Sequence, residues 1–337
     1  MENSNYKFIV VCRDNELYDY AYRQVNNFKN TYFDNHYSLN KMLDFIQKVH
    51  CSSKINAIIN LPFKSYWIKK RINFYVQKLN EMPSNYKNTC IILFADCLQL
   101  EKMGLSRYLR KMIPGIKIVY YFQDLVATEK TKLDFLNNDR KLADLIYSFD
   151  NNDAEQYGML FHNIPYSLPQ EDGMSSECKY DVCFVGKAKN RLDDILEVHN
   201  QLKKKGLKTL FYIVDVPVEK QINGDGIIYG KQISYGNYLK IVKQSKCILE
   251  IMQKGGSGNT IRVNEAIAYD KLLLSDNKYL LQNTLYDSKY MRVFESTDDI
   301  DVSFINDIQH VEYSNKQKML PEEFLKDVEK HLDKRGM

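Results

Sequence analysis

The sequence has no CxxC pair, no long apolar run and almost no charge excess. Its seven cysteines are an odd number at irregular spacing, which argues against a zinc site or a disulfide framework and favours a reducing compartment. No stretch approaches the ~20 apolar residues that a membrane-spanning helix needs. No basic region followed by an apolar stretch opens the chain, so a secretory signal is not expected. These absences together predict a cytoplasmic protein.

The charges are nearly balanced, with 47 Lys and Arg residues against 43 Asp and Glu residues and a net charge of +4. A dedicated nucleic-acid binder concentrates far more positive charge on one face, so nucleic acid is not an expected partner. The fingerprint GxGxxG is also missing after the first predicted strand, where residues 12–16 are CRDNE. A Rossmann dehydrogenase is therefore a poor candidate.

Short apolar runs alternate with helical periodicity along the chain, which predicts an α/β protein with parallel sheets. The length of 337 residues suits two cores better than one. In the first half we expect strands at Lys7–Cys12, Ala57–Leu61, Thr89–Ala95, Lys117–Phe122 and Leu145–Phe149, and helices over Tyr18–Lys29, Leu39–Val49 and Tyr66–Asn80.

A segment without periodicity, Asn163–Lys179, separates the two halves. It contains two prolines and a glycine, so we interpret it as an interdomain linker. The predicted domains are residues 1–165 and 175–318, with residues 319–337 as a C-terminal helix that packs back across the cleft. In the second half we expect strands at Tyr180–Val185, Thr209–Val214, Gly226–Tyr229, Cys247–Ile251 and Lys271–Ser275, and helices over Arg191–Lys205, Ser234–Gln244, Asn259–Tyr269 and Pro321 to about Lys334.

Residues 255–258 (GGSG) join a predicted strand to a predicted helix. Glycines let the backbone approach a ligand closely, and a helix N-terminus offers free N–H groups and the positive end of a dipole. This segment therefore predicts a diphosphate site. In it, Arg262 can neutralise the negative charge of the diphosphate, and the carboxylate of Glu265 can accept hydrogen bonds from two ribose hydroxyls. The alternative is a glycine loop without a ligand, because isolated glycine loops are weak motifs. The backbone and side-chain contacts to the diphosphate are expected from Ser257, Gly258, Asn259 and Thr260.

Cations follow the first strand of the second half, where residues 186–191 are GKAKNR. Ligands of open α/β sheets bind at the carboxyl ends of strands, so Gly186, Lys187 and Arg191 are predicted to face a pyrophosphate. A basic turn that faces water is the simpler interpretation of any single such turn. Residues 229–235 (YGKQISY) follow a short strand, and their backbone, with Tyr229 and Lys231, could hold a nucleobase.

The runs 181–191 (DVCFVGKAKNR) and 255–277 (GGSGNTIRVNEAIAYDKLLLSDN) resemble the donor-binding domain of GT-B glycosyltransferases. The resemblance is to bacterial capsule, exopolysaccharide and lipopolysaccharide transferases, and it is strongest from about Asp144 to Asn277. It implies a fold of two Rossmann-like, doubly wound parallel-sheet domains that face a cleft. It also implies that Lys187 and Arg191 grip the donor diphosphate and that Glu265 binds the ribose. Many retaining members have a further glutamate where this sequence has Ser257, which leaves the stereochemical outcome open.

The first domain is expected to hold the acceptor and any general base. An inverting transferase needs a carboxylate or a histidine within hydrogen-bond reach of the acceptor hydroxyl. Asp14 and Asp124 are the preferred catalytic candidates, because loops after the first and fourth strands can face the cleft, although a turn or cap role is the simpler interpretation of each. No metal and no cofactor are expected, because a helix dipole and cations can replace the metal. Residues of the same kind at strand ends are Arg13, Asp96, Gln123 and Asp150.

The sequence thus predicts a metal-independent hexosyltransferase that uses a nucleoside-diphosphate sugar, most simply a UDP-sugar, and a glycan or lipid-linked acceptor. A nucleotide-sugar epimerase and a non-catalytic partner subunit of another transferase remain as alternatives, and a homodimer is compatible with the sequence. Lys64–Phe74 and Arg107–Met112 mix aromatic residues with cations, which suits peripheral contact with the inner face of an anionic membrane. A helix packed on its own sheet is the simpler explanation of both stretches.

Overall fold

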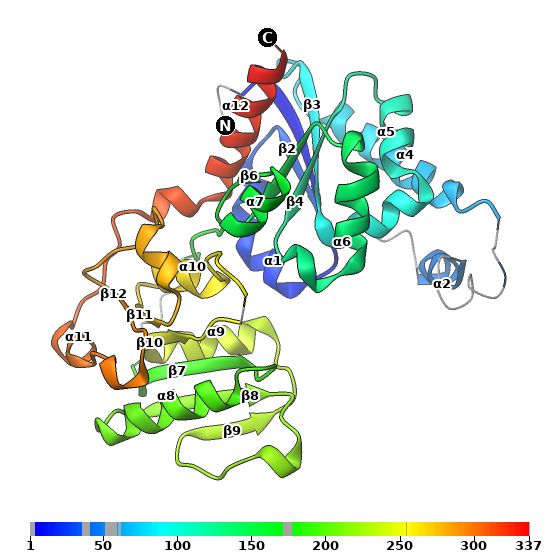
Figure 1. The fold of residues 1–337 in the computed structure, drawn as a ribbon. Helices are drawn as coiled ribbons and strands as arrows, with labels where there is room; N and C mark the ends of the chain where they lie inside the picture. The colour runs from blue at the N-terminus through cyan, green and yellow to red at the C-terminus, as the bar shows by residue number, and fades with distance from the viewer. Residues whose placement is uncertain are drawn as a thin grey trace. The chain divides into compact units, whose positions relative to one another are not determined.

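The computed structural model describes residues 4–35, 41–50, 59, 62–170, 177–253 and 255–336. The chain forms two compact units (Figure 1): the first contains Met1–Phe149, Asp153–His162 and Phe324–Met337, and the second contains Asp150–Asn152 and Asn163–Glu323. The predicted strand Ala57–Leu61 lies outside the described residues except for Ile59.

A six-stranded parallel sheet in the order β2-β1-β3-β4-β5-β6 forms the first unit. Its central strands are apolar almost throughout, as expected for parallel strands that helices cover on both faces. The sequence patterns did not reveal β2, because it has only four residues and ends on an acid. The strands are β1 (Tyr6–Val11), β2 (Thr31–Asp34), β3 (Asn88–Phe94), β4 (Lys117–Phe122), β5 (Leu145–Ser148) and β6 (Leu160–Phe161).

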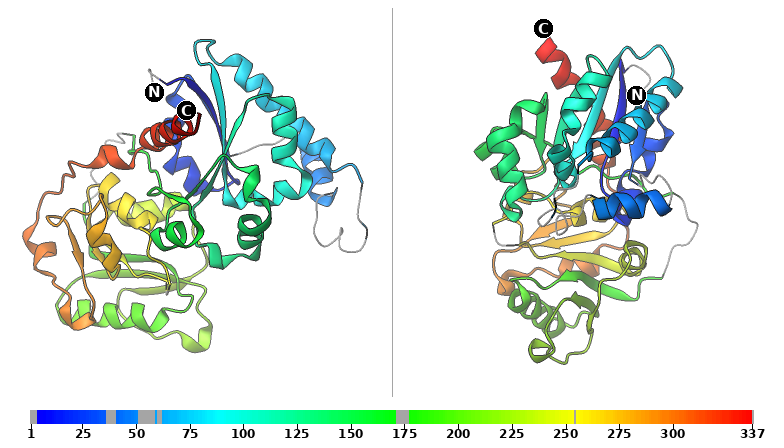
Figure 2. Two further views of the ribbon diagram at one scale, coloured as in Figure 1. Left: turned by 45° about the horizontal axis from the view of Figure 1, so that its top comes forward. Right: turned by 90° about the vertical axis from the view of Figure 1, so that its right-hand side faces the viewer.

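The helices of the first unit lie on both faces of this sheet (Figure 2). The predicted helix Tyr18–Lys29 forms only in part, because its second half is a 3-10 turn. The predicted helix Tyr66–Asn80 is confirmed, and its apolar face packs into the core. The helices are α1 (Glu16–Ala21), α2 (Lys41–His50), α4 (Ser65–Glu81), α5 (Leu105–Met112), α6 (Lys130–Asp134) and α7 (Asn151–Tyr157).

The C-terminal helix α12 (Pro321–Gly336) supplies its last residues to the first unit. The Phe324 ring lies 4.7 Å from that of Tyr121 and 5.4 Å from that of Tyr147. The Tyr147 hydroxyl donates a hydrogen bond to Asp327 at 3.0 Å. The helix predicted from Pro321 is confirmed, and its apolar face is buried: Phe324, Leu325, Val328 and Leu332.

The second unit contains another six-stranded parallel sheet, in the order β12-β11-β10-β7-β8-β9. The Ser234 side chain accepts a hydrogen bond from the Asn237 N–H at 3.2 Å and so caps α9. The strands are β7 (Tyr180–Lys187), β8 (Thr209–Val214), β9 (Ile227–Gly230), β10 (Ser245–Glu250), β11 (Leu272–Ser275) and β12 (Met291–Val293). The helices are α8 (Leu192–Lys204), α9 (Tyr235–Lys243), α10 (Ile261–Ala268) and α11 (Ser303–Asp307).

Each sheet has a point where the direction of winding reverses. The chain leaves β1 towards β2 and then crosses to β3, and it leaves β7 towards β8 and β9 and then crosses to β10. Ligands of open α/β sheets bind outside the carboxyl ends of the strands at such a switch point. Candidate functional sites are therefore expected at the carboxyl ends of β1 and β3 and of β7 and β10. Among the residues that the structure describes, every helix is too short or too polar to cross a bilayer.

Candidate functional site

Two arginines converge at the carboxyl end of β7, at the switch point of the second unit. The guanidinium carbons of Arg191 and Arg262 lie 5.8 and 5.7 Å from the centre of the Phe184 ring. Gly186 leaves room for them, because a Cβ at that position would lie 2.9 Å from Nη2 of Arg262. The Phe184 ring and the space beside Gly186 thus accommodate both guanidinium groups.

Main-chain carbonyls fix both guanidinium groups beside the Phe184 ring. Arg262 donates from Nη2 to the Val185 carbonyl, and Arg191 donates from Nη1 to the Ile251 carbonyl. These carbonyls belong to the ends of β7 and β10, so the two strands that flank the switch point hold the two cations. The guanidinium groups are therefore oriented before any ligand arrives.

Carboxylates near the two arginines favour their charged forms, Glu250 and Asp276 for Arg191 and Glu265 for Arg262, but none in the part of the chain that the structure describes lies at ion-pair distance. Neither arginine forms an ion pair there, and the Nε–H of each is buried without a hydrogen-bond partner. Burial, followed by the charge of Arg262, lowers the pKa of Arg191 to about 10. Both causes act against the charged form, so an anion between the guanidinium groups would stabilise them.

Asn259 adds a third unpaired donor at the end of the glycine loop. Its side chain is buried, and its Nδ2 has no hydrogen-bond partner. Buried polar groups are nearly always hydrogen-bonded, so an unpaired donor here fits a site that a ligand completes. The prediction that Asn259 contacts a ligand is consistent with this geometry.

The glycine loop already holds an internal carboxylate. Asp150 accepts hydrogen bonds from the N–H groups of Ser257 and Gly258, both at 2.7 Å, and from the Ser257 hydroxyl at 2.9 Å. The Asn152 N–H in turn donates to the Ser257 hydroxyl at 3.2 Å. A diphosphate could reach these two N–H groups only by displacing Asp150. Sequence patterns gave no sign of this contact, because its partners are more than 100 positions apart.

Thr260 caps helix α10. Its hydroxyl oxygen accepts from the Arg262 N–H at 3.2 Å and donates its own proton to Glu250. Glu250 is fully buried, and burial raises its pKa. Burial also raises the pKa of the neighbouring Asp276, to about 6. Thr260 is thus committed to the cap and to Glu250, which also accepts a hydrogen bond from its backbone N–H, so a diphosphate would reach Thr260 only by displacing Glu250.

Glu265 is enclosed by tyrosines. Tyr235 donates to its Oε1 at 2.5 Å, and Tyr238 donates to its Oε2. The Tyr166 hydroxyl lies 2.9 Å from that of Tyr235 and extends the network. Burial raises the pKa of Glu265 to about 7. Ribose binding by Glu265 stays a prediction, and it would require a ribose hydroxyl to replace a tyrosine hydroxyl.

The ammonium group of Lys187 does not join the arginine pair, although the Lys187 carbonyl accepts a hydrogen bond from Nη2 of Arg191 at 3.4 Å. Its ammonium forms an ion pair with Asp215 at 2.9 Å and lines a pocket of ≈ 300 Å³ at the ends of β7 and β8. Lys189 and Lys220 line the same pocket. The structure therefore places Arg262, rather than Lys187, next to Arg191.

Tyr229 and Lys231 are also distant from the switch point. They belong to β9 and the turn after it, and β8 separates this edge strand from β7. The Tyr229 hydroxyl is hydrogen-bonded to the main chain of Ile222, and Lys231 is exposed. The structure brings only Tyr235, the last residue of the run 229–235, to the remaining site residues through its bond to Glu265.

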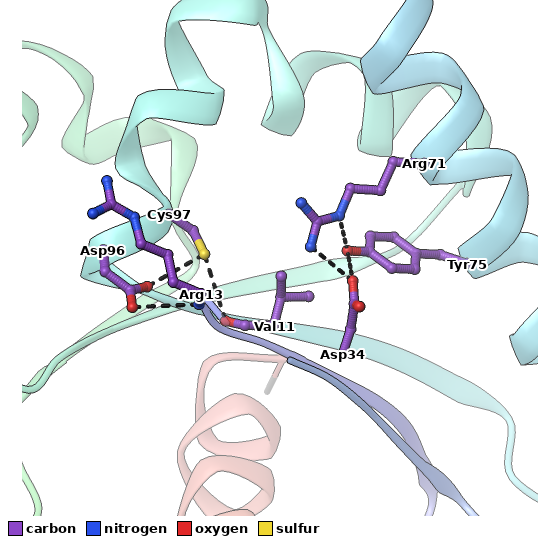
Figure 3. Close-up of polar contacts among 7 residues, drawn as sticks. All are labelled: Val11, Arg13, Asp34, Arg71, Tyr75, Asp96 and Cys97. Atoms are coloured by element: carbon purple, nitrogen blue, oxygen red, sulfur yellow. Dashed lines mark hydrogen bonds and ion pairs between the residues drawn. The ribbon is translucent and has the colours of Figure 1, made fainter. Parts of the chain in front are cut away.

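The switch point of the first unit places Arg13 beside Asp96 (Figure 3). The Arg13 N–H donates to Oδ2 of Asp96 at 3.3 Å, and the Cys97 thiol donates to Oδ1 at 3.3 Å. Burial raises the pKa of Asp96. Asp14 and Asp124 lie at the same edge of the sheet, after β1 and β4, and both are exposed.

The other set of contacts in Figure 3 is a buried ion pair with an added hydrogen bond. Arg71 forms an ion pair with Asp34 at 2.8 Å, and the Tyr75 hydroxyl donates to the same carboxylate at 2.5 Å. Because each charge here has its partner, we interpret this buried group as structural. Among the described residues, no group of three or more acidic, histidine or cysteine side chains could hold a metal ion.

The chain matches no known protein-family model, and no curated protein matches it in sequence. Solved structures do resemble it. One is an alpha-glucosyltransferase in complex with UDP-glucose and DNA containing an abasic site, 13% identical over 96% of this chain and 100% of that chain, with a TM-score of 0.55. Another is an alpha-glucosyltransferase in complex with UDP and a 13-mer DNA containing a central A:G mismatch, 14% identical over 78% of this chain and 84% of that chain, with a TM-score of 0.50.

A third similar structure is a UDP-N-acetylglucosamine 2-epimerase from Rickettsia bellii, 11% identical over 97% of this chain and 96% of that chain, with a TM-score of 0.42. The two six-stranded parallel sheets and the likeness to these glucosyltransferases confirm the GT-B fold predicted from the sequence.

Proposed function

We propose that this protein is a glycosyltransferase that moves a sugar from a nucleoside-diphosphate sugar to a hydroxyl group of a glycan or lipid-linked acceptor. The observation that carries the proposal is the pair of Arg191 and Arg262, two oriented cations without ion-pair partners in the described chain, at a switch point. A glucosyltransferase of similar fold is named as a complex with UDP-glucose, which supports a UDP-sugar as the donor.

The arginine pair suits the chemistry of the leaving group. As the bond between the anomeric carbon and the diphosphate oxygen breaks, its electron pair stays on the diphosphate, where negative charge grows. Oriented donors stabilise such charge without reorganising, and the loss of one typically lowers the rate by a factor of about 10²–10³. Two guanidinium groups can thus supply what a metal ion supplies elsewhere, which supports metal-independent transfer.

The acceptor side of the reaction belongs, in this proposal, to the carboxyl edge of the first unit's sheet. Asp14 or Asp124 would accept the proton of the acceptor hydroxyl as its oxygen bonds to the anomeric carbon. Both carboxylates are exposed at that edge and so are open to a substrate. Substitution of each by Asn distinguishes the two residues. Only the substitution of the general base should abolish acceptor-dependent transfer while leaving UDP affinity unchanged.

A role in building bacterial surface polysaccharide is the finer part of the proposal. It is supported by the resemblance of residues 144–277 to capsule, exopolysaccharide and lipopolysaccharide transferases. Such acceptors are glycans or lipid-linked glycans, and their hydroxyl groups are the nucleophiles that the reaction requires.

The test is a thermal-shift screen of the wild-type chain and Arg191→Ala against UDP, GDP and their sugar conjugates, followed by product analysis of each binder. We expect one nucleotide to raise the Tm of the wild type by several degrees and to leave Arg191→Ala unchanged. Arg292→Ala is the matched control, because Arg292 is half-exposed in the same unit and is paired with Asp301. A Tm unaffected by every nucleotide would falsify the donor site.

Product analysis separates the alternatives. Transfer that depends on an added acceptor supports the glycosyltransferase. An isomerised sugar nucleotide formed without an acceptor would identify an epimerase instead. Binding with neither product, across a panel of acceptors, would indicate a non-catalytic partner subunit.

A further inference from the structure

Strand β10 ends in a fully buried glutamate, Glu250, at the switch point of the second unit. Its Oε1 accepts a hydrogen bond from the Thr260 hydroxyl, and the same carboxylate accepts one from the Thr260 N–H. Its Oε2 accepts from the Ser275 hydroxyl at 2.5 Å. Glu250 thus joins the end of β10 to the cap of α10 and to the end of β11.

The directions of these hydrogen bonds favour the ionised form of Glu250. The Thr260 hydroxyl already accepts the Arg262 N–H, and the Ser275 hydroxyl accepts the Asn277 N–H at 3.0 Å. Each hydroxyl proton is therefore directed to the carboxylate, which meets donors at both of its oxygens. Burial raises the pKa of Glu250, and the two hydroxyls and the charge of Arg262 act in the opposite direction.

The segment that follows β10 has no regular structure of its own near the site. Residues 255–260 belong to neither a helix nor a strand. Side chains from outside this segment therefore fix its path. Asn277 donates from Nδ2 to the Gly258 carbonyl at 3.3 Å, and Glu250 holds Thr260. Because Asn277 is itself bonded to Ser275, a single network around Glu250 holds the segment at two points.

Two groups that could bind an anion depend on these two points. Asn259 lies between Gly258 and Thr260, and its buried Nδ2 has no partner in the part of the chain that the structure describes. Arg262 lies in the first turn of α10, and its guanidinium reaches the Val185 carbonyl at the end of β7. A shift of Thr260 would move both groups, because Thr260 is the neighbour of one and binds the N–H of the other.

We propose that Glu250 is a positioning residue that fixes the places of Asn259 and Arg262 for a diphosphate. It acts without touching the ligand, because both of its oxygens are occupied and its side chain is fully buried. Donors that are in place before a ligand arrives bind developing charge without reorganising, and such placement depends on the side chains that support them. This role rests on the proposed function, since the diphosphate is that of the sugar donor.

The charge of Glu250 and its positioning role have opposite effects on an anion. A negative charge near two guanidinium groups repels a diphosphate, so Glu250→Gln would strengthen binding if charge alone mattered. Loss of positioning would weaken binding, because Glu250→Gln sets an amide NH₂ group among side chains and a main-chain N–H that all donate. The sign of the change in nucleotide affinity therefore distinguishes the two effects.

The first test measures the affinity of the full-length protein by isothermal titration calorimetry with UDP, or with GDP if the thermal-shift screen selects it. Glu250→Gln should raise the Kd by about tenfold, about the effect of losing one hydrogen bond. Ser275→Ala should also raise the Kd although it changes no charge. It leaves Oε2 of Glu250 and the Asn277 N–H without their partner.

Asp181→Asn is the matched control. Asp181 is a partly buried carboxylate near the amino end of β7 in the same sheet, where it accepts the Lys208 N–H and pairs with Lys246, both at 2.8 Å. Its substitution loses similar contacts at the edge of the sheet opposite to the site. The Kd should therefore stay within about twofold of that of the wild type.

The second test measures hydrogen exchange of the full-length protein without a ligand. In Glu250→Gln the amides of residues 255–263 should exchange about tenfold faster, whereas those of β7 and β8 should keep their wild-type rates. A glutamate that only stabilises the sheet would instead give faster exchange along all of its central strands.

An unchanged or lower Kd for Glu250→Gln, beside a wild type that binds the nucleotide, would overturn the positioning role and leave the proposed function intact. Faster exchange along the whole sheet would have the same meaning. If Glu250→Gln does not fold, an unchanged Kd for Ser275→Ala overturns the role in its place. A wild type that binds no nucleotide would overturn both the role and the proposed function.

Discussion

The carboxylate of Asp150 binds the backbone N–H groups of Ser257 and Gly258 at the same distance, 2.7 Å. This is the arrangement in which a glycine loop would bind a phosphate oxygen, with an internal acid in the place of the ligand. The two N–H groups of the loop are therefore already occupied by a carboxylate of the same protein. The arginine pair has no such internal anion, so it is the more available of the two predicted diphosphate contacts.

Asp150→Ala should destabilise the second unit. It would leave two buried N–H groups and the Ser257 hydroxyl without their acceptor, and each buried unpaired group costs about 1–3 kcal/mol. We expect urea denaturation to show a loss of about 2–5 kcal/mol in the free energy of unfolding. Asp298→Ala, at an exposed position in the same unit, should change it by less than about 0.5 kcal/mol. Equal stability of the two variants would contradict the role given to Asp150.

Arg262→Ala should impair nucleotide binding and turnover as strongly as Arg191→Ala. Both guanidinium groups share the Phe184 ring, and each is expected to contact the diphosphate. Turnover should fall by about 10²–10³ in either variant. Arg191→Lys should have little more turnover than Arg191→Ala, because an ammonium group lacks the planar set of donors of a guanidinium group. Lys187→Ala should retain most of the activity, and a Lys187→Ala variant as inactive as Arg191→Ala would restore the pairing expected from the sequence.

Glu265 should make the stability of the protein depend on pH. Its pKa is about 7 in the folded protein against an ordinary value of 4.5. Between these values the folded state keeps a proton that the unfolded state has released, so the free energy of unfolding falls as the pH rises from about 4.5 to about 7. The total change attributable to Glu265 is on the order of 3 kcal/mol.

Glu265→Gln isolates this contribution. The difference in unfolding free energy between the wild type and the variant should change steadily from pH 4.5 to 7 and level off above that range. Glu219→Gln, at an exposed position, should give a flat difference. A flat profile for Glu265→Gln as well would mean that the carboxyl group is not held in the buried tyrosine network.

Phe324→Ala should destabilise the first unit by about 3–5 kcal/mol, because it removes a buried ring that packs on Tyr121 and Tyr147. Lys330→Ala changes an exposed position of the same helix and should have little effect. Denaturation in urea distinguishes the two. If Phe324→Ala matched Lys330→Ala, the packing of α12 on the sheet would be in doubt.

Periodicity predicted most of the strands and helices, whereas the GT-B fold was predicted from the family resemblance. The strands Lys117–Phe122 and Thr209–Val214 begin and end where the apolar runs do, because a buried parallel strand has no other pattern to obscure it. The helix predicted at Asn259–Tyr269 begins later, at Ile261, because Thr260 is its cap. The strand β2 was missed, since four residues ending in Asp34 carry too little pattern.

The candidate site was harder to predict. Sequence reasoning placed Gly186 and Arg191 correctly at a strand end, because the rule for parallel sheets depends only on local order. The resemblance to GT-B transferases paired Arg191 with Lys187, and the glycine-loop segment separately assigned Arg262 to the diphosphate. The fold brings the Arg262 guanidinium beside that of Arg191 from a helix about seventy residues away. The contact of Asp150 with Ser257 depends in the same way on tertiary structure, and no local motif signals it.

The path of the chain has a consequence for how the protein is made. Residues Phe324–Met337 complete a unit that begins at the N-terminus, and they follow the whole of the second unit in sequence. On the ribosome, Tyr121 and Tyr147 therefore emerge long before Phe324, the side chain that covers them. The second unit can fold during translation before the first, which is complete only once residues Phe324–Met337 have been made. Nascent chains would be exposed to aggregation and to chaperones over this interval, and a truncation just before Phe324 would leave the first unit, and not the second, unfinished.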